Sequence, residues 1–270
     1  MPIGFLEFDK DEVWSNPKAE VVQTFGSDNA WYYLTILPAT LLALNPDTVL
    51  PKGFLTNRFL NLDGQKFSTS RGHAIWGEEA SRYLSADVIR LGLACVRPEA
   101  SESDFTLQGL RSTLENRGLR WQQWWAGVGE LGLSSYPNSE KAWTEAQSAY
   151  HRSLIKLWKD ALPARELRDF SLKKQVESLD RLVEVSENFQ ADDDQGQALS
   201  CLAVGIFARL CEPIMPDLAA RLSKAVGVRL VADATCSLPT PGTPIKDLSS
   251  ITLGTTAQID ELQHSRQAQV

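Results

Sequence analysis

The chain has 270 residues, enough for one or two domains of ordinary size. Its 27 Lys and Arg stand against 34 Asp and Glu, which gives a formal net charge of −7, and 43% of its residues are hydrophobic. These values are typical of a globular protein. They argue against broad nucleic-acid binding, because an acidic chain needs a local basic patch to hold phosphates.

The sequence contains no 18-residue apolar run, and its start lacks the basic and apolar regions of a signal peptide. We therefore expect a cytoplasmic protein without a membrane partner. The four cysteines form no C-x-x-C pair. This spacing predicts reduced thiols, with neither a structural zinc ion nor another metal held by this chain.

The first 84 residues have the pattern of a mixed α/β domain. The expected elements, in chain order, are a strand over 21–25, a loop over 26–29, an apolar helix over 30–44, an extended run over 49–56 and a hairpin turn at Asp63-Gly64. We expect the helix to be buried on all sides, with Pro38 kinking it or ending its first segment. Strand, helix and strand in this order are typical of a nucleotide-binding α/β sheet.

From Ser85 onward, apolar residues recur at every third or fourth position, which is the period of helices. Ser85 is the expected N-cap of the first of them. Longer helices, joined by short polar connections, are predicted over 106–131, 140–164, 170–190 and 195–226. The predicted domains are a partial α/β domain over 1–84, a connecting helix and loop over 85–104, an antiparallel helix bundle over 105–238 and a tail over 239–270 that is strapped down or mobile.

Several tryptophans lie on the expected helices of the bundle. They are Trp121, Trp124, Trp125, Trp143 and Trp158. Exposed tryptophans could stack on nucleic-acid bases. Because their spacing is that of one helix face, we expect them to fill the core of the bundle instead.

Residues 64–72 carry the clearest chemical pattern. The segment Gly64-Gln65-Lys66-Phe67-Ser68-Thr69-Ser70-Arg71-Gly72 combines cationic side chains, hydroxyls and glycines. Cations, hydroxyls and backbone N–H groups are the donors that phosphate oxygens accept from. The composition therefore indicates a phosphate-binding loop, and it leaves open the alternative of a basic, hydroxyl-rich surface loop.

Residues 66–72 resemble the KMSKS loop of class I aminoacyl-tRNA synthetases, in the form found in the methionyl-tRNA synthetase family. Other segments resemble motifs of that family in the same order. They are Pro2-Ile3-Gly4-Phe5 (P-I-G-Y), Phe25-Gly26-Ser27-Asp28-Asn29 (F-I-G-K-D-N), Leu37-Pro38-Ala39 (W-P-A), Lys52-Gly53-Phe54-Leu55-Thr56 (H-G-F-L-T), Ser85–Leu91 (F-D-A-D-x-L-R-Y) and Asp104-Phe105-Thr106 (D-x-D-F-T). The resemblance implies an α/β plus all-α fold: the second half of a Rossmann-like catalytic domain, followed by an antiparallel α-helix bundle of the anticodon-binding type.

In that family the loop closes on ATP, which enters with Mg²⁺, and stabilises the transition state that leads to an aminoacyl-adenylate. Cationic donors stabilise the charge that develops on the phosphoryl group. The resemblance implies that the catalytic residues are Lys66, Thr69 and Arg71, and that the ATP-binding residues are Gly26, Asp28, Lys66, Ser68 and Ser70. Thr69 stands where the motif has its second lysine, and Arg71 could partly supply that charge.

The sequence also departs from the family. The H-I-G-H motif, which precedes all of these segments in the family, does not occur in the 270 residues. Three explanations fit: a partner polypeptide supplies the first half of the catalytic domain, the chain is a fragment, or it is a shortened paralogue that has lost catalysis. Half of a parallel sheet leaves an unpaired edge that something must cover.

The amino-acid pocket that the resemblance implies is formed by Pro2, Ile3, Phe5, Tyr32, Tyr33 and Leu37. The tyrosine pair replaces Phe-His of the family, Leu37 replaces a tryptophan and Phe5 replaces a tyrosine. These changes alter the shape and polarity of the pocket. A smaller or more polar amino acid is therefore as good a candidate substrate as methionine.

The predicted helical part of the chain also departs from the family, at the positions that read the anticodon. Trp124 and Val128 stand where the family has the Asn and Arg that read the anticodon, and Asp192–Asp194 form an acidic run in a connection. An acidic run is typical of a solvated helix-cap loop, and it repels phosphates. Recognition of the anticodon is therefore not expected, and tRNA remains a doubtful partner.

Two functions stay open at this point. The first is that of an ATP-dependent ligase that activates an amino acid together with a separately supplied first half, and passes it to tRNA or, without tRNA, to a small amine or hydroxylamine in a biosynthetic pathway. The second is that of a catalytically inactive paralogue that binds a protein or tRNA. The retained Asp28, Lys66 and Arg71 favour the enzyme, because a pure scaffold has no need of a phosphate loop.

Overall fold

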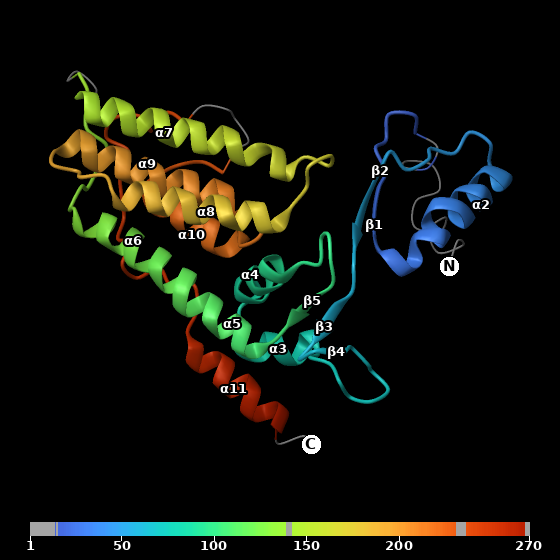
Figure 1. Ribbon diagram of the computed structural model, residues 1–270. Coiled ribbons are helices and arrows are strands. Elements are labelled where there is room, and N and C mark those ends of the chain that lie inside the picture. The colour runs from blue at the N-terminus through green and yellow to red at the C-terminus, as the bar shows by residue number, and fades with distance from the viewer. Residues whose placement is uncertain (1–13, 15, 139–141, 231–235, 268–270) are drawn as a thin grey trace.

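The computed structural model describes residue 14 and residues 16–138, 142–230 and 236–267. A small α/β unit lies on one side of the molecule, and a larger helical body lies on the other (Figure 1). The chain leaves the small unit along one strand and enters the body through a second, small sheet. The expected order, an α/β part followed by an all-α part, is confirmed.

The small unit is a β-α-β motif. Strand β1 (Val22–Gly26) pairs in parallel with β2 (Gly53–Asn57), and the helical segment between them runs through a 3₁₀ turn (Ser27–Asn29) and a π turn (Tyr32–Ile36) into α2 (Leu37–Leu44). The predicted strand–helix–strand order is thus confirmed, with β2 beginning four residues later than the extended run suggested. Pro38 has no N–H to donate back to Leu34, and the π turn lies immediately before it.

The expectation that this helical segment is buried on all sides is wrong. Leu37 and Leu41 are fully buried, but Trp31 is 70% exposed and Leu44 is 62% exposed. The reason is that the described sheet of this unit has two strands. Such a sheet covers one stripe of the helix, and the remaining apolar side chains face outward.

The second sheet holds the loop of interest at its edge. Strand β3 (Leu60–Leu62) pairs antiparallel with β4 (Gln65–Lys66) and parallel with β5 (Ser103–Phe105). Asp63 and Gly64 form the predicted two-residue turn, with φ values of 49° and 76°. Turns of this kind need positive φ at both positions, which Asp-Gly provides at low cost. Helices α3 (Gly77–Tyr83) and α4 (Ala86–Val96) follow, and Ser85 caps α4 as predicted.

The helical body is built from α5 (Leu107–Thr113), a π turn (Leu114–Gly118), α6 (Leu119–Glu130), α7 (Glu145–Ala161), α8 (Leu172–Glu187), α9 (Asp194–Cys211) and α10 (Pro216–Val226). Helix α9 is buried along its length and packs against α7, α8 and α10 (Figure 1). The helix expected over 195–226 is two helices, because Pro213 and Pro216 break it at a corner.

The tryptophans lie where the core prediction places them. Trp121, Trp124 and Trp125 surround Phe207 of α9 at ring-centroid distances of 5.3 to 5.8 Å, and Trp158 is also buried. Trp143 packs against the same core and is partly buried. The core prediction is therefore confirmed, and these four buried rings are not available to stack on nucleic-acid bases.

The end of the described chain returns to the second sheet. Helix α11 (Thr256–Gln267) packs against α3 and α5, with Ile259 and Leu262 buried. Arg111 of α5 forms an ion pair with Asp260. Part of the predicted tail is thus strapped to the region that carries the loop. No helix among the described residues is long and apolar enough to cross a bilayer.

Helix α4 ties this region to the bundle at the corner between α9 and α10. The Asp87 carboxylate accepts from the backbone N–H of Leu218 at 2.7 Å, at the start of α10. Arg90, one turn later, donates to the carbonyls of Pro213 and Ile214, both at 2.7 Å. The acidic and basic side chains of one helix therefore satisfy the free N–H and C=O groups that the corner leaves.

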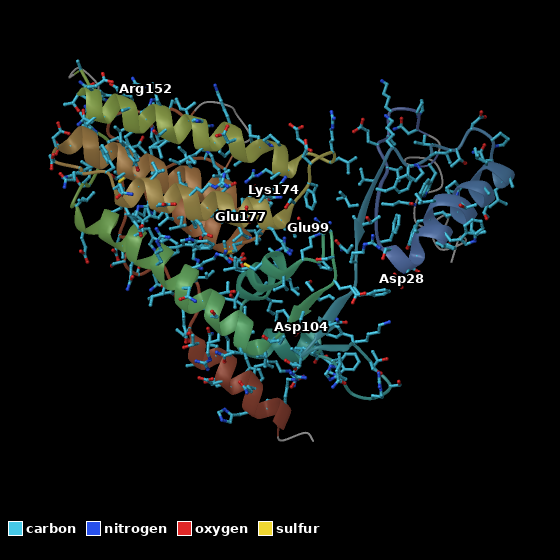
Figure 2. The ribbon with its side chains drawn as sticks, in the orientation of Figure 1. Asp28, Glu99, Asp104, Arg152, Lys174 and Glu177 are labelled. Carbon is cyan, nitrogen blue, oxygen red and sulfur yellow. The ribbon has the colours of Figure 1, made fainter. Side chains whose placement is uncertain are left out.

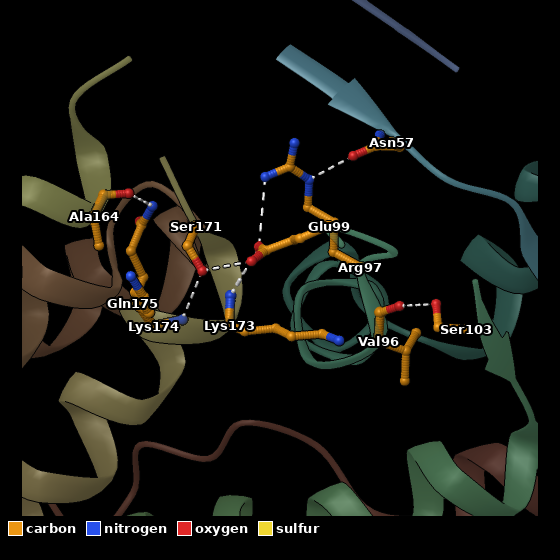
Figure 3. Close-up of polar contacts among 10 residues, drawn as sticks. All are labelled: Asn57, Val96, Arg97, Glu99, Ser103, Ala164, Ser171, Lys173, Lys174 and Gln175. Carbon is orange, nitrogen blue, oxygen red and sulfur yellow. Dashed lines mark hydrogen bonds and ion pairs between the residues drawn. The ribbon is translucent and has the colours of Figure 1, made fainter. Parts of the chain in front are cut away.

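A second polar network joins the small unit to the bundle (Figure 3). Arg97 donates to the Asn57 side chain at the end of β2, at 2.8 Å, and it lies 3.5 Å from the Glu99 carboxylate. Glu99 in turn accepts from the Ser171 hydroxyl, which caps α8 by accepting from Lys174 N. The position of β2 is thus coupled through three side chains to the start of a bundle helix.

Candidate functional site

The loop over 67–72 is anchored at both of its ends. Ser68 and His73 exchange both backbone N–H···O bonds, each at 2.9 Å, and Gly72 N donates to the Thr69 carbonyl at 3.2 Å. Gly72 has a φ of 68°, a conformation that favours glycine. The His73 ring lies 2.8 Å from the Leu62 carbonyl, so the returning strand is fastened to β3.

The polar side chains of the loop gather at its tip. Arg71 Nε donates to the Ser68 hydroxyl at 3.1 Å, and the hydroxyls of Ser68 and Ser70 are 3.4 Å apart. Lys66 Nζ lies over the Phe59 ring at 4.9 Å, close to the point where the loop begins. Lys66, Thr69 and Arg71 are all exposed, so a concentrated set of cationic and hydroxyl donors faces solvent.

The hairpin beneath the loop is supported by strand β5. Asp104 accepts from Gly64 N at 2.8 Å, and Phe105 accepts from Asp63 N through its carbonyl at 3.1 Å. Arg71 and Gly72 also line an open hollow of about 680 Å³, whose other walls come from α3, the start of α5 and Arg266 of α11. The loop is therefore held by the sheet and bordered by the C-terminal helix.

The small unit carries the other predicted ATP residues. Gly26 ends β1, and Asp28 follows in the 3₁₀ turn, exposed, with its carboxylate 3.3 Å from the Asn29 amide nitrogen. A Cβ at position 26 would lie 2.5 Å from the Asp28 carboxylate oxygen, so a side chain there would make the carboxylate shift. The Asp28 carboxylate is thus exposed to solvent at the carboxyl end of a parallel strand, where ligands of α/β sheets bind, and it can accept further hydrogen bonds there.

The two tyrosines of the predicted amino-acid pocket pack next to this turn. The Tyr33 ring stacks on Phe25 of β1 with a centroid distance of 4.7 Å, and the Tyr32 ring meets Tyr33 edge-on at 5.1 Å. Leu37 is fully buried in a small core cluster with Trp14 and Leu41. Pro2, Ile3 and Phe5 lie outside the described residues.

The structure brings some of the predicted residues together and leaves others apart. Ser68, Thr69, Ser70 and Arg71 share one loop, with Lys66 at the end of β4 just before it, and Gly26, Asp28, Tyr32 and Tyr33 lie close along the chain between the end of β1 and the π turn. No hydrogen bond or ion pair among the described residues joins these two groups (Figure 2 shows Asp28 on the small unit).

Gln23 was not singled out from the sequence. It lies in the middle of β1, its side chain is 7% exposed, and neither of its amide atoms has a hydrogen-bond partner. The sequence signal that could have identified Gln23 is a polar residue within a β-prone run over 21–25 that is otherwise mostly apolar. Asp87 and Arg90 stood in a recognised segment, but their role at the corner of α9 and α10 could not be predicted without the tertiary structure.

The two positions that correspond to the family's anticodon-reading residues are buried. Trp124 and Val128 are each 8% exposed, so neither side chain faces solvent in a way that would contact a nucleotide. In the acidic run, the Asp193 carboxylate accepts from Gly196 N at 2.9 Å and from the Gln147 amide at 2.7 Å. It caps helix α9, and the interpretation as a helix-cap loop is confirmed.

Comparison with known proteins gives one consistent result. Residues 7–126 match the family described as tRNA synthetases class I (M). The methionine–tRNA ligase of Thermomicrobium roseum is 38% identical over 96 residues, which cover 36% of this chain and 16% of the relative. That of Pyrobaculum islandicum is 27% identical over 274 residues, which cover 88% of this chain and 45% of the relative.

The fold agrees with this. The methionyl-tRNA synthetase of Mycobacterium tuberculosis, solved with methionyl-adenylate bound, superposes with a TM-score of 0.68 at 17% identity, over 86% of this chain and 49% of that one. Over residues 7–126 this chain is therefore similar to the methionyl-tRNA synthetase family, and the likeness of fold extends over most of the chain. The chain spans less than half the length of the curated relatives of the family that it matches.

Proposed function

We propose that this chain carries the second half of an adenylate-forming site. There the carboxylate of an amino acid attacks the α-phosphorus of Mg²⁺-bound ATP, an aminoacyl-adenylate forms and pyrophosphate leaves. Lys66, Thr69 and Arg71 stabilise the charge on the phosphoryl oxygens, and Asp28 accepts from the ribose hydroxyls. The first half, with an H-I-G-H motif, comes from a preceding segment or from a separate polypeptide in the cytoplasm.

The observation that carries this proposal is the donor set on the loop over 67–72. The Arg71 guanidinium and two hydroxyls are exposed on a loop whose base is fixed by paired backbone hydrogen bonds and by the His73 ring, and the exposed Lys66 stands on β4 where the loop begins. Donors that are held before the reaction need little reorganisation when charge develops on a phosphate.

The small unit supports the need for a further α/β half. Parallel sheets are normally covered on both faces, and a two-stranded sheet is marginal alone. Here Val22, Trp31 and Phe54 are exposed, with Trp31 at 70%. Additional strands and helices beside β1 and β2 would bury these side chains.

The acceptor of the activated amino acid is proposed to be a small amine or hydroxylamine, so that the ligation is independent of tRNA. Supporting this, Trp124 and Val128 are buried, and the connection before α9 is acidic. The net charge of −7 also disfavours a polyanionic partner. A tRNA-charging assay with the complete enzyme is expected to give no aminoacyl-tRNA.

ATP binding and ATP–pyrophosphate exchange test the proposal. In Lys66→Met and Arg71→Met we expect exchange to fall roughly 10²-fold, the usual loss for one such donor. The control is Arg152→Met, at the far end of the bundle in Figure 2, where an exposed ion pair with Glu145 is removed. If the parent protein shows neither ATP binding nor exchange, the alternative of an inactive binding module is correct. If exchange is measurable but equal in all three variants, the roles assigned to Lys66 and Arg71 are wrong.

A further inference from the structure

The small unit contains an unusual concentration of buried polar atoms without partners. Among the described residues, seven buried side-chain nitrogen or oxygen atoms have no hydrogen-bond partner. Three of them belong to two residues of this unit, namely the amide nitrogen and oxygen of Gln23 and the phenol oxygen of Tyr32. Buried polar atoms are nearly always paired in folded proteins, so unpaired ones call for an explanation.

These atoms lie in one layer of the unit. Gln23 and Phe25 stand two positions apart on the buried face of β1, and the Tyr33 ring stacks on the Phe25 ring. Tyr32 meets the edge of Tyr33 and packs on the core cluster of Trp14, Leu37 and Leu41. Both residues therefore belong to the layer between the sheet and the helical segment, with Gln23 on β1 before Asp28 and Tyr32 one helical turn after it.

We propose that Gln23 and Tyr32 select an amino acid whose side chain is polar and uncharged, and that they do so by hydrogen bonding to it. This inference rests on the proposed function and adds to it that this layer holds the side chain of the amino-acid substrate. The phenol can donate and accept, and the amide supplies a donor and an acceptor. A hydroxyl or carboxamide side chain would pair with both residues.

Two observations narrow the class of amino-acid side chain that this layer would accept. Among the described residues of the small unit, the buried polar side chains are Gln23 and Thr48, which are both neutral. A charged substrate would find no buried counter-ion there, and burying an unpaired charge is strongly unfavourable. Methionine offers at most a weak acceptor, so it would leave the phenol and the amide unpaired. A site built to hydrogen-bond its substrate rejects such an analogue by up to roughly 10⁴–10⁵-fold.

The test uses the full 270-residue chain combined with the H-I-G-H-bearing half that the proposed function requires, and isothermal titration calorimetry with four stable ligands. These are sulfamoyl-adenosine and its seryl, glutaminyl and methionyl derivatives. We expect the seryl or the glutaminyl derivative to bind at least 10-fold more tightly than the methionyl one. In Tyr32→Phe and in Gln23→Leu this ratio should fall toward one, with the affinity for sulfamoyl-adenosine itself unchanged.

The control is Tyr83→Phe, which removes a phenol from α3 and should keep the full preference. Without ligand, Tyr32→Phe should not lower the melting temperature, because the lost hydroxyl has no partner. A lower melting temperature in Tyr32→Phe would mean that the phenol has a structural partner. A preference that survives in both variants would mean that the phenol and the amide do not select the substrate. Either result would overturn the inference.

The outcomes separate the two proposals. If sulfamoyl-adenosine binds but the methionyl derivative binds as tightly as the polar ones, the selectivity inference is wrong and the proposed function stands. If sulfamoyl-adenosine and all three derivatives fail to bind, the proposed function and the inference both fail.

Discussion

The corner between α9 and α10 offers a quantitative test of how helix α4 is fastened to the bundle. Asp87 is 2% exposed, and its carboxylate accepts from Leu218 N at 2.7 Å and, more weakly, from Asp217 N at 3.4 Å. Replacing it in Asp87→Ala leaves these N–H groups at the start of α10 without an acceptor. It also removes a negative charge from the positive end of the helix dipole.

The expected loss follows from these contacts. A hydrogen bond to a charged group contributes about 1.5–3 kcal/mol, and a carboxylate at a buried helix N-terminus adds about 0.3–1 kcal/mol. We expect Asp87→Ala to lower the free energy of unfolding by about 2–4 kcal/mol. Asp87→Asn keeps one acceptor oxygen and should recover about half of this.

Arg90 makes the complementary contacts on the same corner. Arg90→Met removes two bonds to carbonyls at 2.7 Å and should cost about 1–2 kcal/mol. Because both residues hold one corner, the double variant should deviate from additivity by at least about 0.5 kcal/mol. Variants at distant sites that share no partner would add.

Urea unfolding followed by tryptophan fluorescence measures these changes, since Trp121 and Trp125 are buried in the bundle. Arg152→Ala, which breaks an exposed ion pair, serves as the control and should stay within about 0.5 kcal/mol of the parent. A loss below about 0.5 kcal/mol for Asp87→Ala, or equal losses for Ala and Asn, would refute the capping argument.

Three further predictions concern the loop, the link between the parts and pH. Gly72→Ala places a side chain at a φ of 68°, at a cost of about 1–2 kcal/mol, so calorimetry should show weaker ATP binding. Arg97→Ala removes the bond to Asn57, and hydrogen exchange should become faster in β1 and β2 but not in α9. Burial raises the pKa of the Cys201 thiol from 9.0 to about 12. As the pH rises, the unfolded chain therefore loses this proton before the folded chain does. The free energy of unfolding should not depend on this thiol below about pH 8.5, and above that pH it should fall by up to about 1.4 kcal/mol per pH unit. Urea unfolding at several pH values should show a less steep fall in Cys201→Ala.

Much of the local structure could be predicted from the sequence, because it depends on neighbours along the chain. The Asp63-Gly64 turn follows from the positive φ that both positions need. The caps at Ser85 and Asp193 follow from side chains that bond N–H groups three residues ahead. The grouping of donors over 66–71 follows from simple adjacency.

Other features required the tertiary structure. The helical segment after β1 is apolar all round, yet whether a given side chain is buried depends on how many strands lie beside it. The pairing of Asp87 with Leu218 spans 131 positions, and no local pattern indicates it. The unpaired state of Gln23 and Tyr32 depends on what surrounds each side chain in space.

By itself the sequence determined the resemblance to a known family, the order of the parts and the grouping of cationic and hydroxyl side chains over 66–71, since these depend on motifs and local propensity. The tertiary structure decided which apolar and polar side chains are left without partners, because burial and hydrogen bonding are properties of packed segments that lie far apart in the chain.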